Sequence, residues 1–192
     1  MFFKNKNIVI GVTGGIAAYK SAEIIRLFKK EGAEVRIVMT ESAKEFITPL
    51  TLQTVSGNEI HDSLLNANAE LAMSHIELAK WADIILIAPC TAETMAKITH
   101  GRAEDLMGAI ILASKACIYI APAMNMNMWS DKSTQENFKT LSTPSPVEYY
   151  FYELIRCVSI PLKKFILSSL KKIFHSHRIL LIVGTYNGLY LL

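Results

Sequence analysis

The chain has 192 residues, 51% of them hydrophobic, and can bury the core of one domain without disulfide or metal staples. Residues 1–140 hold 14 Lys and Arg against 15 Asp and Glu, whereas residues 141–192 hold 6 against 2, so the main part of the chain lacks the basic surface of a nucleic-acid-binding protein. The N-terminus has no secretory signal pattern, no apolar run approaches the ~20 residues that span a bilayer, and the three cysteines have no disulfide or metal-ligand spacing. We therefore expect a cytoplasmic protein.

Short apolar runs alternate with helical patterns along the first two thirds of the chain. Gly14 and Gly15 lie in a glycine turn between the first apolar run and the first helical pattern, and Pro89 and Pro122 mark the ends of two later runs. The predicted strands are residues 8–12, 35–39, 84–88 and 117–120. The predicted helices are residues 16–30, 69–82, 91–99 and 106–113, and a further helical stretch is expected after Thr40 and Ser42, which can cap it.

This alternation favours an α/β fold: a Rossmann-like (flavodoxin-like) parallel sheet with helices on both faces, in three layers. In such a sheet, ligands bind outside the carboxyl ends of the strands. Four polar or glycine-rich segments begin where a predicted strand ends, so we expect them to meet at one edge of the sheet. They are residues 13–16, 40–42, 89–94 and 122–129.

The glycine turn reads G-x-x-G-G, a pattern that permits close approach of a phosphate to the backbone at the start of a helix. The same turn can also be a tight connection that binds nothing. After the second strand, Thr40 and Ser42 flank Glu41. A dinucleotide enzyme would use an acidic residue there for ribose hydroxyls, whereas two hydroxyl side chains suit a phosphate better, so a mononucleotide such as FMN is favoured over NAD.

Three further side chains have two interpretations each. His75 falls on the apolar stripe of its predicted helix, so it is either a hydrogen-bonded core residue or a base that titrates near neutral pH. Cys90 is either a small buried thiol or a nucleophile. Asn125 lies in a methionine-rich segment without clear periodicity, which is either core or a place where its amide binds a substrate carboxylate or thiolate.

Four segments in this order, VTGGIAAYK, SHIELAKWAD, APCTAETMAKI and PAMNMNMW, resemble the homo-oligomeric flavin-containing cysteine decarboxylase family. Within that family they are most similar to the phosphopantothenoylcysteine decarboxylases that form the N-terminal half of a bacterial bifunctional decarboxylase/synthetase. The resemblance covers residues 5–141 and departs from the family at Cys90, Thr91 and Glu93, where the family has Ala, Ser and Asn.

The resemblance implies an enzyme: an FMN-dependent carboxy-lyase that converts phosphopantothenoylcysteine into phosphopantetheine in coenzyme A biosynthesis, assembled as a homotrimer or dodecamer. It implies that His75 is the active-site base and that Asn125, with Met124 beside it, binds the substrate carboxylate. The residues that it implies as FMN contacts are Gly14, Gly15, Thr40, Ser42, Phe46, Thr91, Ala92, Glu93, Thr94 and Ala123. We expect neither a metal ion nor a nucleic-acid or membrane partner.

Residues 1–141 thus form the expected flavin-binding domain, and residues 142–192 an atypical basic, apolar tail that does not match the family. The tail lacks the family's glycine-rich loop with a proton-donating cysteine, and Cys157 has no neighbouring glycines that would let a loop close, so the reductive half of the reaction is in question. Two alternatives stay open for the chain: an FMN-binding protein without turnover, regulatory or defective, and a flavin prenyltransferase. For the tail, a replaced continuation, irregular packing on the domain and a membrane-surface helix stay open.

Overall fold

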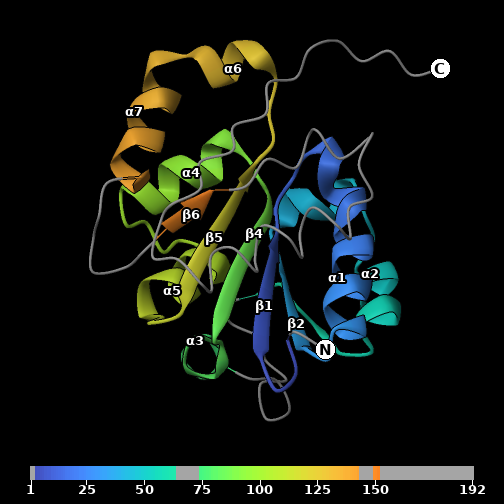
Figure 1. The fold of residues 1–192 in the computed structure, drawn as a ribbon. Helices are drawn as coiled ribbons and strands as arrows, with labels where there is room; N and C mark the ends of the chain where they lie inside the picture. Colours follow the sequence, from blue (N-terminus) through green and yellow to red (C-terminus); the bar gives the residue numbers. More distant parts are fainter. Residues whose placement is uncertain (1–2, 64–73, 143–148, 152–192) are drawn as a thin grey trace, which may run out of the picture.

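A parallel sheet forms the centre of the molecule (Figure 1). The computed structural model describes residues 3–63, 74–142 and 149–151. Within them, six strands are ordered β3-β2-β1-β4-β5-β6 and each neighbouring pair is parallel, which confirms the expected fold class. The strands are β1 (Asn7–Val12), β2 (Glu34–Met39), β3 (Ile60–His61), β4 (Ile84–Cys90), β5 (Cys117–Pro122) and β6 (Tyr149–Phe151).

Helices cover both faces of the sheet and complete the three layers (Figure 1). Successive residues of β1 point to opposite faces: Ile10 packs in the same core cluster as Phe28, whereas Val9 packs with Leu78 and Ile110. The first face carries η1 (Ile16–Lys20), α1 (Ser21–Lys30), η2 (Glu41–Glu45) and α2 (Pro49–Ser56). The second face carries α3 (His75–Trp81), α4 (Ala92–Thr99), α5 (Leu106–Ala113), α6 (Met126–Ser130) and α7 (Lys132–Ser142).

Local sequence signals set the ends of several helices. Thr48 accepts a backbone hydrogen bond at the start of α2, Pro49 occupies its first turn, and Gly57 ends it with a φ of 72°. Ser74 and Glu77 form a capping box at the start of α3. The hydrogen bonds that Glu77 makes with Ser74 lower the pKa of the Glu77 carboxyl below its usual value.

Two prolines lie inside strands that we expected them to end. β4 continues through Pro89 to Cys90, and β5 includes Pro122. The pairing of β4 with β5 shifts register between Ile87 and Cys90, and this irregularity accommodates a residue that has no N–H to donate. The Ala88–Pro89 peptide bond is cis.

The remaining differences from prediction concern the start of the first helix and several elements that were not predicted. The helix predicted over residues 16–30 begins with a 3₁₀ segment, η1, before α1. The helical stretch expected after Thr40 and Ser42 is η2 followed by α2, and Thr48 is the residue that caps α2. The elements β3, α6, α7 and β6 have no counterpart among the predicted ones. Three of these four are too short to show a period.

Among the described residues, no helix combines the length and the apolar character needed to cross a membrane. β6 and the last residue of α7 lie beyond residue 141, and β6 pairs with β5. The expected boundary between residues 1–141 and 142–192 stays a prediction. Most of the tail, Cys157 included, lies outside the described residues.

Candidate functional site

The loops that follow β1, β2, β4 and β5 are hydrogen-bonded to one another at the carboxyl edge of the sheet. The backbone N–H of Thr40 donates to the carbonyl of Val12 at 3.1 Å, and that of Ala123 donates to the carbonyl of Cys90 at 3.0 Å. Between these two links, the Thr13 hydroxyl accepts the backbone N–H of Thr91, the residue that follows β4, at 3.2 Å. The four segments expected to meet at one edge therefore do so.

A pocket of ≈ 380 Å³ lies at this edge, next to the point where the strand order reverses between β1 and β4. The chain leaves these two strands toward opposite faces, and such a divergence leaves a crevice in which α/β proteins bind nucleotides. The volume falls within the range of about 300–1,000 Å³ typical of small-molecule sites. The pocket is lined by Gly14, Gly15, Ile16, Ala17, Thr91, Ala92, Ala123, Met124, Asn125 and Met128.

The two glycines of the first turn are needed here for different reasons. A Cβ on Gly14 would lie 2.5 Å from the Cβ of Ser42 and 2.8 Å from its carbonyl carbon, contacts that no side-chain rotation relieves. A Cβ on Gly15 would find its nearest neighbour, the Thr91 Cγ2, at 3.9 Å, and would project into the pocket. Gly14 therefore lets the loop after β2 pack against the turn, while Gly15 leaves backbone facing the pocket.

Asn125 lines the pocket from the loop after β5 and is also the N-cap of α6. Its Oδ1 accepts a hydrogen bond from the backbone N–H of Asn127 at 2.8 Å. Because the cap engages the amide oxygen, the Nδ2 donors are what Asn125 offers to a ligand. Such donors suit a carboxylate.

Four of the expected cofactor contacts lie at the start of α4, in three different environments. Thr91 and Ala92 line the pocket. The Thr91 Oγ1 accepts a hydrogen bond from the backbone N–H of Thr94 at 3.2 Å, and Thr94 lies buried outside the pocket wall. The Glu93 carboxylate is exposed and lies 4.0 Å from the Nζ of Lys97.

The loop after β2 adjoins the pocket without lining it. Thr40 Oγ1 and Ser42 Oγ are 3.2 Å apart, next to the glycine turn. Phe46 is 47% exposed and is not part of the pocket wall. Glu41, the acidic residue that a dinucleotide site would use, pairs instead with the Nζ of Lys44 at 2.8 Å.

His75 is the first residue of α3 and is half-buried. The structure contradicts its interpretation as a core residue, because the buried positions of the helix are Leu78 and Ala79. Within one chain, His75 is not part of the pocket wall that contains Asn125. Its role as a base stays a prediction.

Cys90 is fully buried, and its thiol donates to the carbonyl of Thr91 at 3.6 Å. Burial raises the pKa of this thiol far above its usual value. A thiolate is the reactive form of cysteine, so the interpretation of Cys90 as a nucleophile does not hold.

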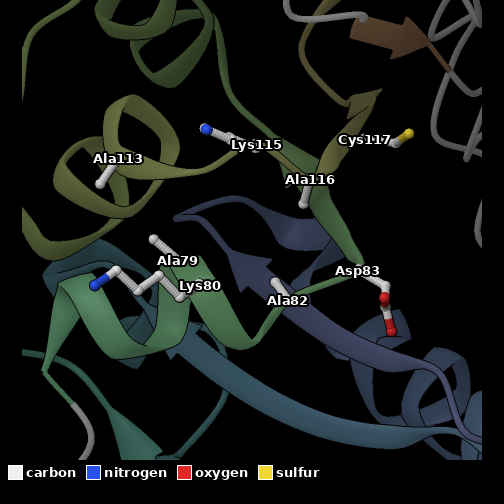
Figure 2. A pocket seen from close by; sticks show the side chains of 8 residues that line it. All are labelled: Ala79, Lys80, Ala82, Asp83, Ala113, Lys115, Ala116 and Cys117. Atoms are coloured by element: carbon white, nitrogen blue, oxygen red, sulfur yellow. The ribbon is translucent and has the colours of Figure 1, made fainter.

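A larger cavity, ≈ 490 Å³, lies at the amino edge of the sheet, where α3 and α5 end and β5 begins (Figure 2). Four of the eight residues that line it are alanines. The charged ends of Lys80, Lys115 and Asp83 lie apart from one another (Figure 2), and the Asp83 Oδ2 already accepts the backbone N–H of Asn7 at 2.9 Å. This cavity therefore lacks a set of converging polar groups.

Three residues of the pocket wall were not among the predicted contacts: Ile16, Ala17 and Met128. The first two directly follow the glycine turn, and this position at the start of a helix was a signal that could have predicted them. Met128 lies on α6, whose single turn leaves no period in the sequence that would show which side faces the pocket.

Comparison with known sequences shows relatives over most of the chain. The family model described as Flavoprotein matches residues 3–171, past the expected end of the flavin-binding domain. Over 143 residues the chain is 57% identical to the coenzyme A biosynthesis bifunctional protein CoaBC of Haemophilus influenzae, a match that covers 74% of this chain and 36% of that protein. The chain thus spans about a third of the length of the curated relatives it matches.

Two solved structures share the three-layer arrangement. A PPC decarboxylase variant complexed with pantothenoylaminoethenethiol is 26% identical, with a TM-score of 0.71 and coverage of 90% of this chain and 100% of that one. The FMN binding protein AtHal3 is 26% identical, with a TM-score of 0.69 and coverage of 90% and 98%. Both likenesses agree with the flavodoxin-like fold observed here.

Proposed function

The chain belongs to the Flavoprotein family, and from that premise we propose that it binds FMN and decarboxylates phosphopantothenoylcysteine to form phosphopantetheine in coenzyme A biosynthesis. The observation that carries the proposal is the pocket at the carboxyl edge, whose wall joins the glycine turn, the start of α4 and Asn125. The 57% identity to CoaBC supports the substrate. The likeness to an FMN binding protein supports the choice of flavin.

The residues at this pocket fit a flavin mononucleotide. The backbone of Gly14 and Gly15, with the hydroxyls of Thr40 and Ser42 beside it, would hold the phosphate through hydrogen-bond donors. The wall also leaves large apolar side chains uncovered: Ile16 is 61% exposed and Met128 50% exposed. A planar aromatic ring lying between the loops would cover this apolar surface.

The residues of the chain have distinct roles in the proposed reaction. When bound, FMN supplies the oxidation of the cysteinyl thiol that allows the adjacent carboxylate to leave as CO₂. Asn125 would orient that carboxylate through its Nδ2 donors, with Met124 beside it. His75 would accept the proton that the thiol loses, since a neutral imidazole nitrogen can act as a general base.

Because His75 lies outside the pocket wall of its own chain, the proposal includes an oligomer. The base must reach the site from a neighbouring subunit or through a change of shape. We propose the homotrimer or dodecamer that the resemblance implies. Light scattering on the purified protein tests this, and a fully active monomer would contradict it.

Two measurements test the proposed function. Visible absorbance of the protein, after removal of free FMN by gel filtration, reports cofactor binding. Mass spectrometry after incubation with phosphopantothenoylcysteine reports turnover. Phosphopantetheine is the expected product, and an accumulating enethiol would mean that decarboxylation proceeds without the reductive half. Bound FMN with unchanged substrate would contradict the decarboxylase and leave the FMN-binding protein without turnover.

A further inference from the structure

Thr13 is buried between two loops that form the pocket, yet it does not line the pocket itself. Its side chain is 1% exposed, and it lies between the last residue of β1 and Gly14. Burying a hydroxyl costs free energy unless the hydroxyl is hydrogen-bonded. The partners of Thr13 therefore show which parts of the structure it holds together.

The Thr13 hydroxyl makes two hydrogen bonds, one to Pro89 near the end of β4 and one to Thr91, the residue that follows the strand. Its Oγ1 donates to the carbonyl of Pro89 at 2.7 Å and accepts the backbone N–H of Thr91 at 3.2 Å. A hydroxyl has one proton and two lone pairs, so both bonds can exist together. They lie beyond Gly11 and Ile87, the last residues at which β1 and β4 pair. The Thr13 side chain thus links the ends of β1 and β4 beyond the point where their backbones stop pairing.

The two chain segments that Thr13 joins both line the pocket. On one side the chain continues into Gly14 and Gly15, and on the other Thr91 lines the pocket and caps α4. A change in the spacing of these two segments would change the shape of the pocket that they line. Thr13 can set that spacing from a buried position outside the pocket wall.

We propose that Thr13 is a positioning residue for FMN: its hydroxyl sets the distance between the glycine turn and Thr91, and through it the affinity of the pocket, without touching the cofactor. This inference rests on the proposed function, since FMN is the ligand whose affinity is measured.

The test compares two substitutions at Thr13. Thr13→Val keeps the branched shape and removes both hydrogen bonds, whereas Thr13→Ser keeps the hydroxyl. The Kd of FMN, titrated by quenching of flavin fluorescence, should rise about ten-fold in Thr13→Val because the Pro89 carbonyl and the Thr91 N–H lose the partner that holds them beside the glycine turn. In Thr13→Ser the Kd should return to the wild-type range. An unchanged Kd in Thr13→Val overturns the proposal.

Ser21 supplies the matched control. It is also fully buried, and its Oγ donates to the carbonyl of Ala88 at 2.9 Å, on the same strand but outside the pocket wall. Ser21→Ala should lower the melting temperature of the protein, as Thr13→Val does, and leave the Kd of FMN unchanged. An equal loss of affinity in both variants would show that any buried hydroxyl near β4 suffices, and would overturn the proposal.

Two further outcomes also test the role of Thr13. If Thr13→Val does not fold, Thr13→Cys replaces it: the thiol is a weak donor and acceptor, so the Kd should lie above that of wild type, and a wild-type Kd overturns the proposal. Wild-type protein that binds no FMN would refute the proposed function and this inference together. Binding by wild type that is insensitive to Thr13 refutes this inference alone.

Discussion

The two edges of the sheet differ in what they place around their cavities. At the carboxyl edge, glycine backbone, a threonine and an asparagine from three loops surround ≈ 380 Å³. At the amino edge, four alanines and a few separated charges surround ≈ 490 Å³ (Figure 2). The larger cavity is therefore the chemically poorer one, and in this fold the convergence of strand ends, rather than volume, locates the site.

The polar groups of the two edges also serve different purposes. At the amino edge they close the fold: the Ser114 Oγ donates to the carbonyl of Ala79 at 3.0 Å, and Asp83 accepts the backbone N–H of Asn7. At the end of β3, on the other edge, the His61 Nε2 is buried and has no hydrogen-bond partner among the described residues. The carboxyl edge thus holds a buried polar atom, the His61 Nε2, that the described part of the fold leaves without a partner.

The largest difference is expected between the two ends of α3. His75, its first residue, is the proposed base, and Lys80 lines the cavity at the amino edge. His75→Asn should lower the rate of decarboxylation by about 10²- to 10⁴-fold, as the loss of a general base does, and keep FMN bound. Lys80→Ala should change neither quantity. Steady-state turnover and flavin absorbance measure both, and unchanged turnover in His75→Asn would remove the histidine from the mechanism.

A smaller effect should separate the two glycines of the pocket. Gly14→Ala overpacks the contact with Ser42, so the melting temperature should fall and the Kd of FMN should rise by about ten- to a hundred-fold. Gly15→Ala places its Cβ in ordinary van der Waals contact, 3.9 Å from the Thr91 Cγ2, so it should weaken FMN binding without lowering the melting temperature of the ligand-free protein. Calorimetric titration and thermal unfolding test the pair, and equal melting temperatures would contradict the distinction.

His61 should give the carboxyl edge a modest sensitivity to acid. Burial lowers the pKa of His61 below its ordinary value of 6.5, and Arg36 lowers it further. Below pH 6.5 the unfolded chain takes up a proton that the folded chain resists, so the stability that neutral His61 allows is complete above pH 6.5 and declines as the pH falls. Urea unfolding on both sides of this pH should show a smaller decline in His61→Leu; an equal decline in both proteins would contradict the assignment.

The smallest effect is expected at the amino edge. Lys80 and Lys115 are exposed and their charged ends lie apart, so replacing both with Ala should leave the Kd of FMN unchanged even at low ionic strength (Figure 2). The proposed phosphate donors, those of the glycine turn, lie at the other edge. A marked loss of affinity in the double variant would move the phosphate site to the amino edge and reverse the comparison.

Much of the fold could be predicted because it follows local periodicity. The helix predicted over residues 106–113 is α5 with the same bounds, and the strand predicted over residues 8–12 is β1 with one more residue. The ends of β4 and β5 could not be predicted, because the rule that proline ends a strand is local, whereas pairing with a neighbour decides whether an irregular strand continues.

Sequence patterns alone established the parallel α/β sheet and the set of segments that meet at its carboxyl edge, because the ends of parallel strands share an edge in any such sheet. Only the tertiary structure decided which side chains share a wall: Thr91 faces the pocket, Thr94 lies outside its wall, Cys90 is sealed in the core, and His75 is absent from the wall that holds Asn125. The physical reason is that these directions depend on packing and on hydrogen bonds between distant segments, such as the Thr13 bond across 76 residues, and no local pattern encodes them.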